Sequence, residues 1–334
     1  MDLKDCIVTG RIWRDGVVVD DDVTPEDISL ASRDEALMWW IDMLAPSEQA
    51  LADLAARLGL APTTVEDAVA PHERPKVTRH GESLFFTLYT TQLVDPRRDV
   101  RGAGRLHTGR LSGIVLPHAL ITIRLDDSVD LAPVLARWEG NADLLPSGVG
   151  ALLHGLLDVV VDGHFETIQA LDDEIEALED ELFAPRGRGS ELVERVYRFR
   201  KDLVALRRVV LPMREVVNAV VRHRSRTGTD LDHWYDDLYD HVLRAGEWTE
   251  SLRDLATSVF ETNLSLHDAR LNTIMKKLAG WGAIIAIPTA ITGWFGMNVP
   301  YPGFSKPAGL YLSITLIVTL AGGLYLAFKR RDWL

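Results

Sequence analysis

Near the end of the chain, the tripeptide Gly296-Met297-Asn298 combines three residues that suit the recognition of a hydrated cation. Asn298 carries a neutral side-chain oxygen, Gly296 allows close approach of the backbone, and Met297 adds bulk without charge. Because Mg²⁺ gives up its coordinated waters reluctantly, amide and carbonyl oxygens could select it by accepting hydrogen bonds from those waters. The ordinary structural alternative is a glycine that ends a helix, followed by an asparagine in a turn.

Two segments without a charged side chain flank this tripeptide, Leu278 to Met297 and Gly309 to Phe328. Each has about 20 residues, the length that a helix needs to cross the hydrocarbon core of a bilayer. We therefore expect a first transmembrane helix over 276–298, an extracellular loop over 299–308, and a second transmembrane helix with a basic cytosolic tail over 309–334. A pair of buried helices in a large soluble core is the alternative.

Basic residues next to these segments predict their orientation. Lys276 and Lys277 precede the first span, residues 329–331 (Lys-Arg-Arg) follow the second, and the connecting loop carries only Lys306. The positive-inside rule then places both flanks in the cytoplasm and the tripeptide outside. The expected location is the inner (plasma) membrane, with two passes and with cytoplasmic N- and C-termini.

Composition limits the remaining classes of function. The 334 residues carry a formal net charge of -13, and the acidic excess lies upstream of the spans, so a nucleic-acid partner is not expected. Cys6 is the only cysteine, and Met1 to Gly10 lacks the apolar core of a signal peptide, so everything before Lys276 should stay in the cytosol. Phosphate-binding loops, paired-cysteine metal sites and nucleophile elbows are absent from the sequence, which argues against an enzyme and against a nucleotide ligand.

The first 150 residues predict a cytosolic domain of mixed α and β structure. Runs at 84–89, 111–116 and 120–123 are rich in β-branched and aromatic residues and predict neighbouring strands of a small sheet. Ser47, an apolar stripe through Leu58, and then Gly59 predict a capped helix. We expect Arg97 to Gly104 to form an exposed loop.

From about residue 150 onward, apolar residues recur at helical spacing. A break at Pro185-Arg186-Gly187 predicts an antiparallel helical hairpin over 151–228, which Leu211-Pro212 interrupts. Beyond Gly228 no convincing stop signal appears before Phe295, so one helix of about 65 residues should contain a stalk over 229–275 and the first span. The acidic run from Asp172 to Glu181 is most simply the solvated face of a helix.

Five stretches taken together resemble the CorA family of magnesium and cobalt channels. They are Val65-Glu66-Asp67 with His72 to Val77, Leu171 to Ile175, Tyr235 to His241, Arg270 to Leu278, and Gly293 to Asn298. The resemblance implies an α+β cytosolic domain, a long stalk helix and two transmembrane helices, assembled as a homopentameric funnel around a central pore. The acidic loop that is frequent in the family after this tripeptide is replaced here by Val299 to Lys306.

The resemblance also implies roles for individual residues. Gly296, Met297 and Asn298 would form the selectivity filter, and Asp95 and Asp237 would hold a regulatory Mg²⁺ between facing subunits. The face of the first span that lines the pore would carry Asn272, Met275, Leu278, Gly282, Ala286, Thr289 and Gly293. Met275 and Leu278 could block ions by dewetting, whereas ordinary helix packing would also explain the small residues.

The sequence thus predicts a passive, Mg²⁺-gated uptake channel for Mg²⁺, and also for Co²⁺ and Ni²⁺, whose partners are copies of itself, membrane lipid and divalent cations. Two other functions remain open. One is zinc transport, as in a related branch of the superfamily, against which Met297 argues mildly. The other is a membrane-anchored scaffold, which would have no need of Asn298.

Overall fold

The computed structural model describes residues 3–70, 73–94, 105–182, 189–224, 231–298, 300, 303–304 and 306–333. Two compact units make up the chain, Met1–Thr257 and Ser258–Leu334. Each unit is described by itself below.

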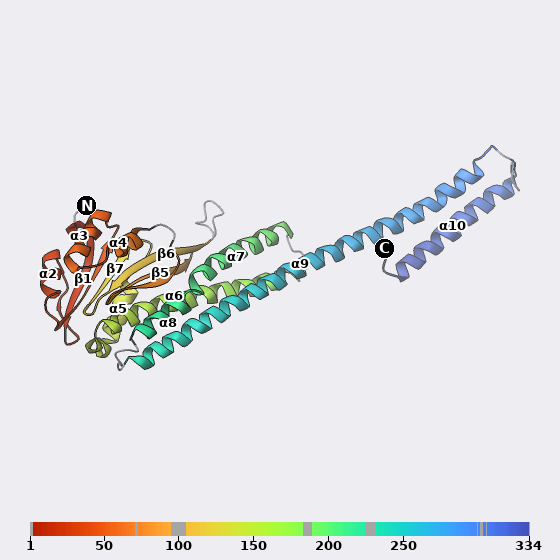
Figure 1. The fold of residues 1–334 in the computed structure, drawn as a ribbon. Coiled ribbons are helices and arrows are strands. Elements are labelled where there is room, and N and C mark those ends of the chain that lie inside the picture. Colours follow the sequence, from red (N-terminus) through yellow and green to blue (C-terminus); the bar gives the residue numbers. More distant parts are fainter. Residues whose placement is uncertain are drawn as a thin grey trace. The chain divides into compact units, whose positions relative to one another are not determined.

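A seven-stranded sheet forms the centre of the first unit, in the order β2-β1-β3-β7-β6-β5-β4 (Figure 1). Its strands are β1 (Ile7–Arg14), β2 (Val17–Asp20), β3 (Leu37–Leu44), β4 (Lys76–His80), β5 (Ser83–Leu93), β6 (Leu106–Val115) and β7 (Ala119–Arg124). Neighbouring strands are antiparallel except β3 and β7, which run parallel. The strands predicted from the sequence are β5, β6 and β7, and the sheet is larger than expected because β1 to β4 join it.

From about residue 150 onward, the helices of the structure largely agree with those predicted from the sequence. They are α1 (Leu3–Cys6), α2 (Pro25–Ala31), α3 (Glu48–Leu58), α4 (Pro62–Val69), α5 (Ala132–Gly140), α6 (Val149–Leu182), α7 (Gly189–Val210), α8 (Met213–Arg224), α9 (Asp232–Phe295) and α10 (Pro307–Arg330), with a short 3₁₀ helix at Ala142–Ser147. The predicted caps of α3 are confirmed. The Ser47 hydroxyl accepts a hydrogen bond from the backbone N–H of Ala50, and Gly59 adopts the left-handed conformation with φ +66°.

Alternation along the strands divides the core of the first unit between the two faces of the sheet. Trp39, Phe85 and Ile121 belong to a cluster on one face with residues of α2, α3 and α4. A directly adjacent residue in each of these strands, Trp40, Phe86 or Leu120, belongs to a cluster on the other face with residues of α5, α6, α8 and the start of α9. The first unit is therefore a sheet between two helical layers (Figure 1).

The helical hairpin of α6 and α7 is confirmed, and ion pairs show that it is antiparallel. Glu181 near the end of α6 pairs with Arg195 near the start of α7. Further along, Arg105, the residue just before β6, pairs with Glu174 of α6 and with Asp202 of α7. Leu211 and Pro212 separate α7 from α8, where the sequence predicts an interruption.

One buried histidine marks the contact between α6 and the sheet. His164 donates a hydrogen bond from Nε2 to the backbone oxygen of Tyr89 in β5, at 2.8 Å. Burial lowers the pKa of His164 from 6.5 to about 4, since a charged imidazolium would lose its hydration there. The ring is therefore neutral at physiological pH and serves as a hydrogen-bond donor in the core.

Within the part of the chain that the structure describes, two helices are long and apolar enough to cross a membrane, α9 and α10. The predicted unbroken helix to Phe295 is confirmed, since α9 spans 64 residues. Lys329 and Arg330 lie in the last turn of α10, and the Lys329 ammonium lies 5.9 Å from the centre of the Tyr325 ring.

Candidate functional site

The tripeptide Gly296-Met297-Asn298 continues the chain beyond the last turn of α9 and forms a bend there. The backbone N–H of Gly296 donates to the oxygen of Thr292 at 2.8 Å, and that of Met297 donates to the oxygen of Trp294 at 3.3 Å. A Cβ atom on residue 296 would lie 2.9 Å from the Thr292 oxygen, closer than side chains normally approach. Gly296 does not have a positive φ, so it is not the left-handed glycine cap that would be the ordinary reason for a glycine here.

Asn298 stands at the exposed end of this turn. Its side-chain amide makes no hydrogen bond to any residue that the structure describes. The carbonyl oxygen of this amide therefore keeps its capacity to accept hydrogen bonds from a solvated ligand. Met297 is exposed beside it, with 39% of its surface accessible.

A second tight turn leads into α10. Gly303 has φ +95°, a value that favours glycine, and its oxygen accepts a hydrogen bond from the backbone N–H of Lys306 at 3.1 Å. A Cβ atom on Gly309 would come within 2.5 Å of that same oxygen. Glycines thus shape the chain on both sides of the bend.

The seven residues assigned to the pore by resemblance share one face of α9. All seven are exposed in the single chain: Asn272, Met275, Leu278, Gly282, Ala286, Thr289 and Gly293. At about 100° per residue they lie opposite a stripe of buried and half-buried residues on the same helix. This stripe is Gly280, Ile284, Ile287, Pro288, Ile291 and Phe295.

The exposed face of α9 changes character along its length. Met275 and Leu278 present large apolar side chains that are 62% and 67% exposed. Gly282, Ala286 and Gly293 are small, and the Thr289 hydroxyl donates to the backbone oxygen of Ile285 at 3.0 Å. The Thr289 oxygen therefore still offers lone pairs to water on this face.

The two residues assigned to a regulatory cation differ in what the structure shows. Asp237 lies exposed on α9, and its carboxylate is 3.8 Å from Nε2 of His241. Asp95 lies outside the described residues. Among the described residues, no three His, Cys, Asp or Glu side chains gather in a way that could hold a metal ion. Asp237 therefore offers one exposed carboxylate on α9, the kind of oxygen ligand that divalent cations such as Mg²⁺ accept.

The acidic run of α6 is only partly a solvated face. Asp173, Glu176, Glu179 and Asp180 are exposed as predicted, but Glu174 and Glu181 pair with arginines. The buried Asp202 of α7 also accepts hydrogen bonds from the backbone N–H groups of Arg105 and Leu106, at 2.8 and 3.2 Å. This cluster has no local pattern in the sequence, because Arg105 lies 69 residues from Glu174 and 97 residues from Asp202.

Comparison with known proteins assigns this architecture. The family described as CorA-like Mg²⁺ transporter protein matches residues 35–330. The chain belongs to this family. The cobalt/magnesium transport protein CorA of Methanocaldococcus jannaschii is 27% identical over 330 residues, covering 97% of this chain and 98% of that protein. The zinc transport protein ZntB of Pectobacterium carotovorum is 28% identical over 292 residues, covering 82% of each.

The fold is shared with a solved member of the CorA-like family. The complete structure of the CorA magnesium transporter from Methanocaldococcus jannaschii matches with a TM-score of 0.74 at 24% identity, covering 98% of this chain and 99% of that one. The predicted α/β domain, long helix and two candidate spans are thereby confirmed. The chain is a membrane protein and a metal-ion transporter of the CorA-like family, and the prediction that it is not an enzyme follows from that membership.

Proposed function

We propose that the chain forms a passive, Mg²⁺-gated uptake channel for Mg²⁺, and also for Co²⁺ and Ni²⁺, in the inner (plasma) membrane. The observation that carries this proposal is the exposed Asn298 amide, which lies three residues beyond the end of a helix whose exposed face carries the residues assigned to the pore. Residues 276–298 and 309–334 would contain the two spans, residues 299–308 would form the outer loop, and both termini would be cytoplasmic.

Selection at the bend would act on the hydrated ion. The Asn298 oxygen is neutral, so it can accept hydrogen bonds from coordinated water without replacing that water in the first shell of the ion. Gly296 allows the turn to close against the Thr292 oxygen. This turn would hold Met297 and Asn298 at the mouth of the pore. A ring of such turns would favour an ion that keeps its waters, as Mg²⁺ does.

The exposed face of α9 supports assembly around a central axis. An unpartnered helix face with small residues and a hydroxyl is expected to meet other helices or water rather than lipid alone. In a homopentamer, five copies of Met275 and Leu278 would narrow the cytosolic end, where an apolar ring can exclude water. Asn272 and Thr289 would provide polar rings on either side.

Regulation would act through Asp237. Apposed carboxylates repel one another unless a divalent cation lies between them. Asp237 is exposed and forms no ion pair with a lysine or arginine that the structure describes, so it is available to share a divalent cation with a carboxylate of a facing subunit, for which Asp95 is the candidate. Closed packing would then be favoured at high internal Mg²⁺ and lost at low Mg²⁺, as a shift between two populations.

Membrane potential alone can drive such uptake. A divalent ion that moves inward across 100 mV gains about 4.6 kcal/mol, from about 2.3 kcal/mol per elementary charge. An ATP site is therefore not required for accumulation.

Zinc is the second candidate cargo, because a zinc transport protein is among the relatives that match most of the chain. The neutral oxygens of the bend favour Mg²⁺, whereas Zn²⁺ prefers nitrogen and sulfur ligands. Parallel flux measurements with Mg²⁺, Co²⁺, Ni²⁺ and Zn²⁺ in proteoliposomes separate the two. A dominant Zn²⁺ flux would replace the magnesium assignment.

The filter is tested by Asn298→Ala in the same liposomes. The substitution removes the oxygen and little packing, so we expect Mg²⁺ flux to fall to near background while the size of the assembled protein is unchanged. Ser313→Ala, which deletes an exposed hydroxyl of α10, is the matched control and should transport like the parent. Parent-level flux in Asn298→Ala would leave the hairpin as an anchor only.

A further inference from the structure

The outer face of α7 carries an apolar stripe with positive charges. Val193, Tyr197 and Val204 are 45%, 69% and 41% exposed, and they follow one another at helical spacing. Arg200 and Arg208 lie exposed on the same stripe and make no ion pair with any described residue. These five residues are called the α7 stripe below. A soluble helix rarely leaves such a face uncovered.

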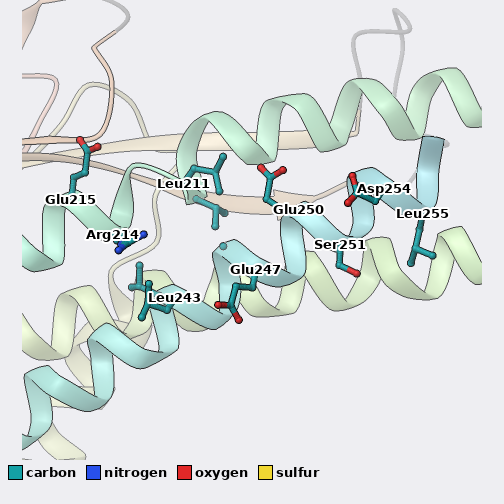
Figure 2. Close-up of a pocket in the computed structure, with 12 residues that line it drawn as sticks. Leu211, Arg214, Glu215, Leu243, Glu247, Glu250, Ser251, Asp254 and Leu255 are labelled. Carbon is teal, nitrogen blue, oxygen red and sulfur yellow. The ribbon is translucent and has the colours of Figure 1, made fainter. Parts of the chain in front are cut away.

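A groove of the opposite charge lies elsewhere in the same unit. The end of α7 and the start of α8 form one wall, α9 forms the other, and the groove has a volume of about 880 Å³ (Figure 2). Leu211 and Leu243 contribute apolar surface to it. Its acidic residues are Glu215, Glu247, Glu250 and Asp254, against one basic residue, Arg214.

The charges in the groove are only partly balanced within the chain. Glu250 pairs with Arg207 and Arg253, and Arg253 also holds Asp254. Glu215 and Glu247 are exposed and have no ion-pair partner among the described residues. Two unpaired carboxylates over an apolar floor thus complement two unpaired guanidinium groups on an apolar stripe.

We propose that the α7 stripe of one copy docks in this groove of a second copy of the chain. Tyr197 and Val204 would bury their apolar surface against Leu211 and Leu243. Arg200 and Arg208 would approach Glu215 and Glu247, and opposite charges across a contact fix its partner and alignment. The volume of the groove is sufficient for several side chains. A second copy of the chain would thus cover both the exposed α7 stripe and the acidic groove.

The stripe and the groove share no residue, so the contact is heterologous. A heterologous contact closes into a ring when its rotation is suitable and otherwise extends into a filament. This inference rests on the proposed homopentamer, and it specifies which cytosolic surfaces meet between neighbouring subunits. It does not depend on the ion that is transported.

A mixed crosslinking experiment on the full-length protein tests the contact. One chain carries Tyr197→Cys and one tag, and a second chain carries another tag and Ser251→Cys, at an exposed residue of the groove lining that keeps both carboxylates in place. Both chains are expressed together in the membrane. We expect a bismaleimide crosslinker to give a dimer band that contains both tags. Arg200→Glu with Arg208→Glu in the first chain should reduce this band several-fold, and Glu215→Arg in the second chain should restore part of it.

Controls separate a specific contact from random collision and from misfolding. The parent, whose Cys6 is buried, should give no band, and Glu176→Cys on the exposed face of α6 should replace Tyr197→Cys without giving one. An absent mixed band in an assembly that still transports Mg²⁺ would overturn the docking while leaving the proposed channel intact. An equal band from Glu176→Cys, or one that ignores the charge reversals, would overturn it as well.

Discussion

Protonation of the buried His164 should make the fold sensitive to acid. The pKa of this imidazole falls from 6.5 in the unfolded chain to about 4 in the folded one. Between these two values the unfolded chain binds a proton that the folded chain cannot bind, so the free energy of unfolding decreases as the pH falls through this window. The stabilisation is fully present above the unfolded pKa.

The size of the effect follows from the shift. Each pKa unit corresponds to about 1.4 kcal/mol, so the full window is worth about 3 kcal/mol. At about pH 5 most of it, about 2 kcal/mol, should already be lost. The His164 Nε2 donates to the Tyr89 oxygen at 2.8 Å, so a replacement should keep that donor while removing the titration.

His164→Gln meets this requirement, because its side-chain amide can donate to the same oxygen and carries no titrating proton. Urea unfolding of the full-length protein in detergent, followed by tryptophan fluorescence at about pH 7.5 and about pH 5, gives the pH-dependent loss for each protein. We expect the parent to lose about 2 kcal/mol more than the variant between the two conditions. Equal losses in the two proteins would refute the assignment of acid sensitivity to this buried ring.

Three further substitutions test the gate, the regulatory residue and the buried cluster. Leu278→Asn should raise Mg²⁺ leak at high internal Mg²⁺, because an amide stabilises water in the constriction, and Leu278→Ile should not. In the parent, Mg²⁺ should protect the cytosolic part from a protease; Asp237→Ala should abolish this protection, and the control Asp236→Ala, at an exposed neighbouring residue, should keep it. If the protection depends on the Mg²⁺ concentration in the same way in Asp237→Ala and in the parent, the regulatory ion binds elsewhere. Asp202→Asn, at a side chain that is 1% exposed, should cost about 3–5 kcal/mol of unfolding free energy, and Glu181→Gln, in a more exposed pair, at most about 1 kcal/mol; similar losses would contradict the role of burial.

The sequence predicted the helices better than the sheet, for a physical reason. A helix such as α9 is specified by its own period and by the absence of stop signals, which are local properties. Strand β3 reads Leu-Met-Trp-Trp-Ile-Asp-Met-Leu and is buried on both faces, so it lacks the alternation that identifies a strand. Its assignment as a strand depends on its pairing with β1 and β7, which are distant in the sequence.

One missed hairpin did have a local signal. Asp15 and Gly16 both have positive φ, 51° and 79°, as the tight turn between β1 and β2 requires. An Asp-Gly pair between two β-rich runs predicts such a turn. The hairpin could therefore have been predicted from its sequence, whereas the pairing of β1 with β3 depends on long-range packing.

The candidate site divides in a similar way. The position of Gly296 at the end of a charge-free helix could be inferred from composition and length alone. Its need to be glycine could not, because that follows from the approach of the Thr292 oxygen in the folded turn. The cluster of Arg105, Glu174 and Asp202 was equally inaccessible, since nothing local in the sequence distinguishes these charges from solvated ones.

Geometry at the mouth links the proposed filter to the proposed docking contact. One Asn298 side chain offers a single carbonyl oxygen, whereas the octahedral water shell of Mg²⁺ presents hydrogens in every direction. If Asn298 forms the proposed filter, a single chain is insufficient to surround a hydrated ion, and several copies would have to hold their Asn298 side chains at equal distances from one axis. A closed heterologous contact supplies equal spacing because every subunit makes the same two-surface contact with its neighbours. Pairing of the α7 stripe with the acidic groove would thus help to fix the symmetry that the ring of Asn298 side chains requires.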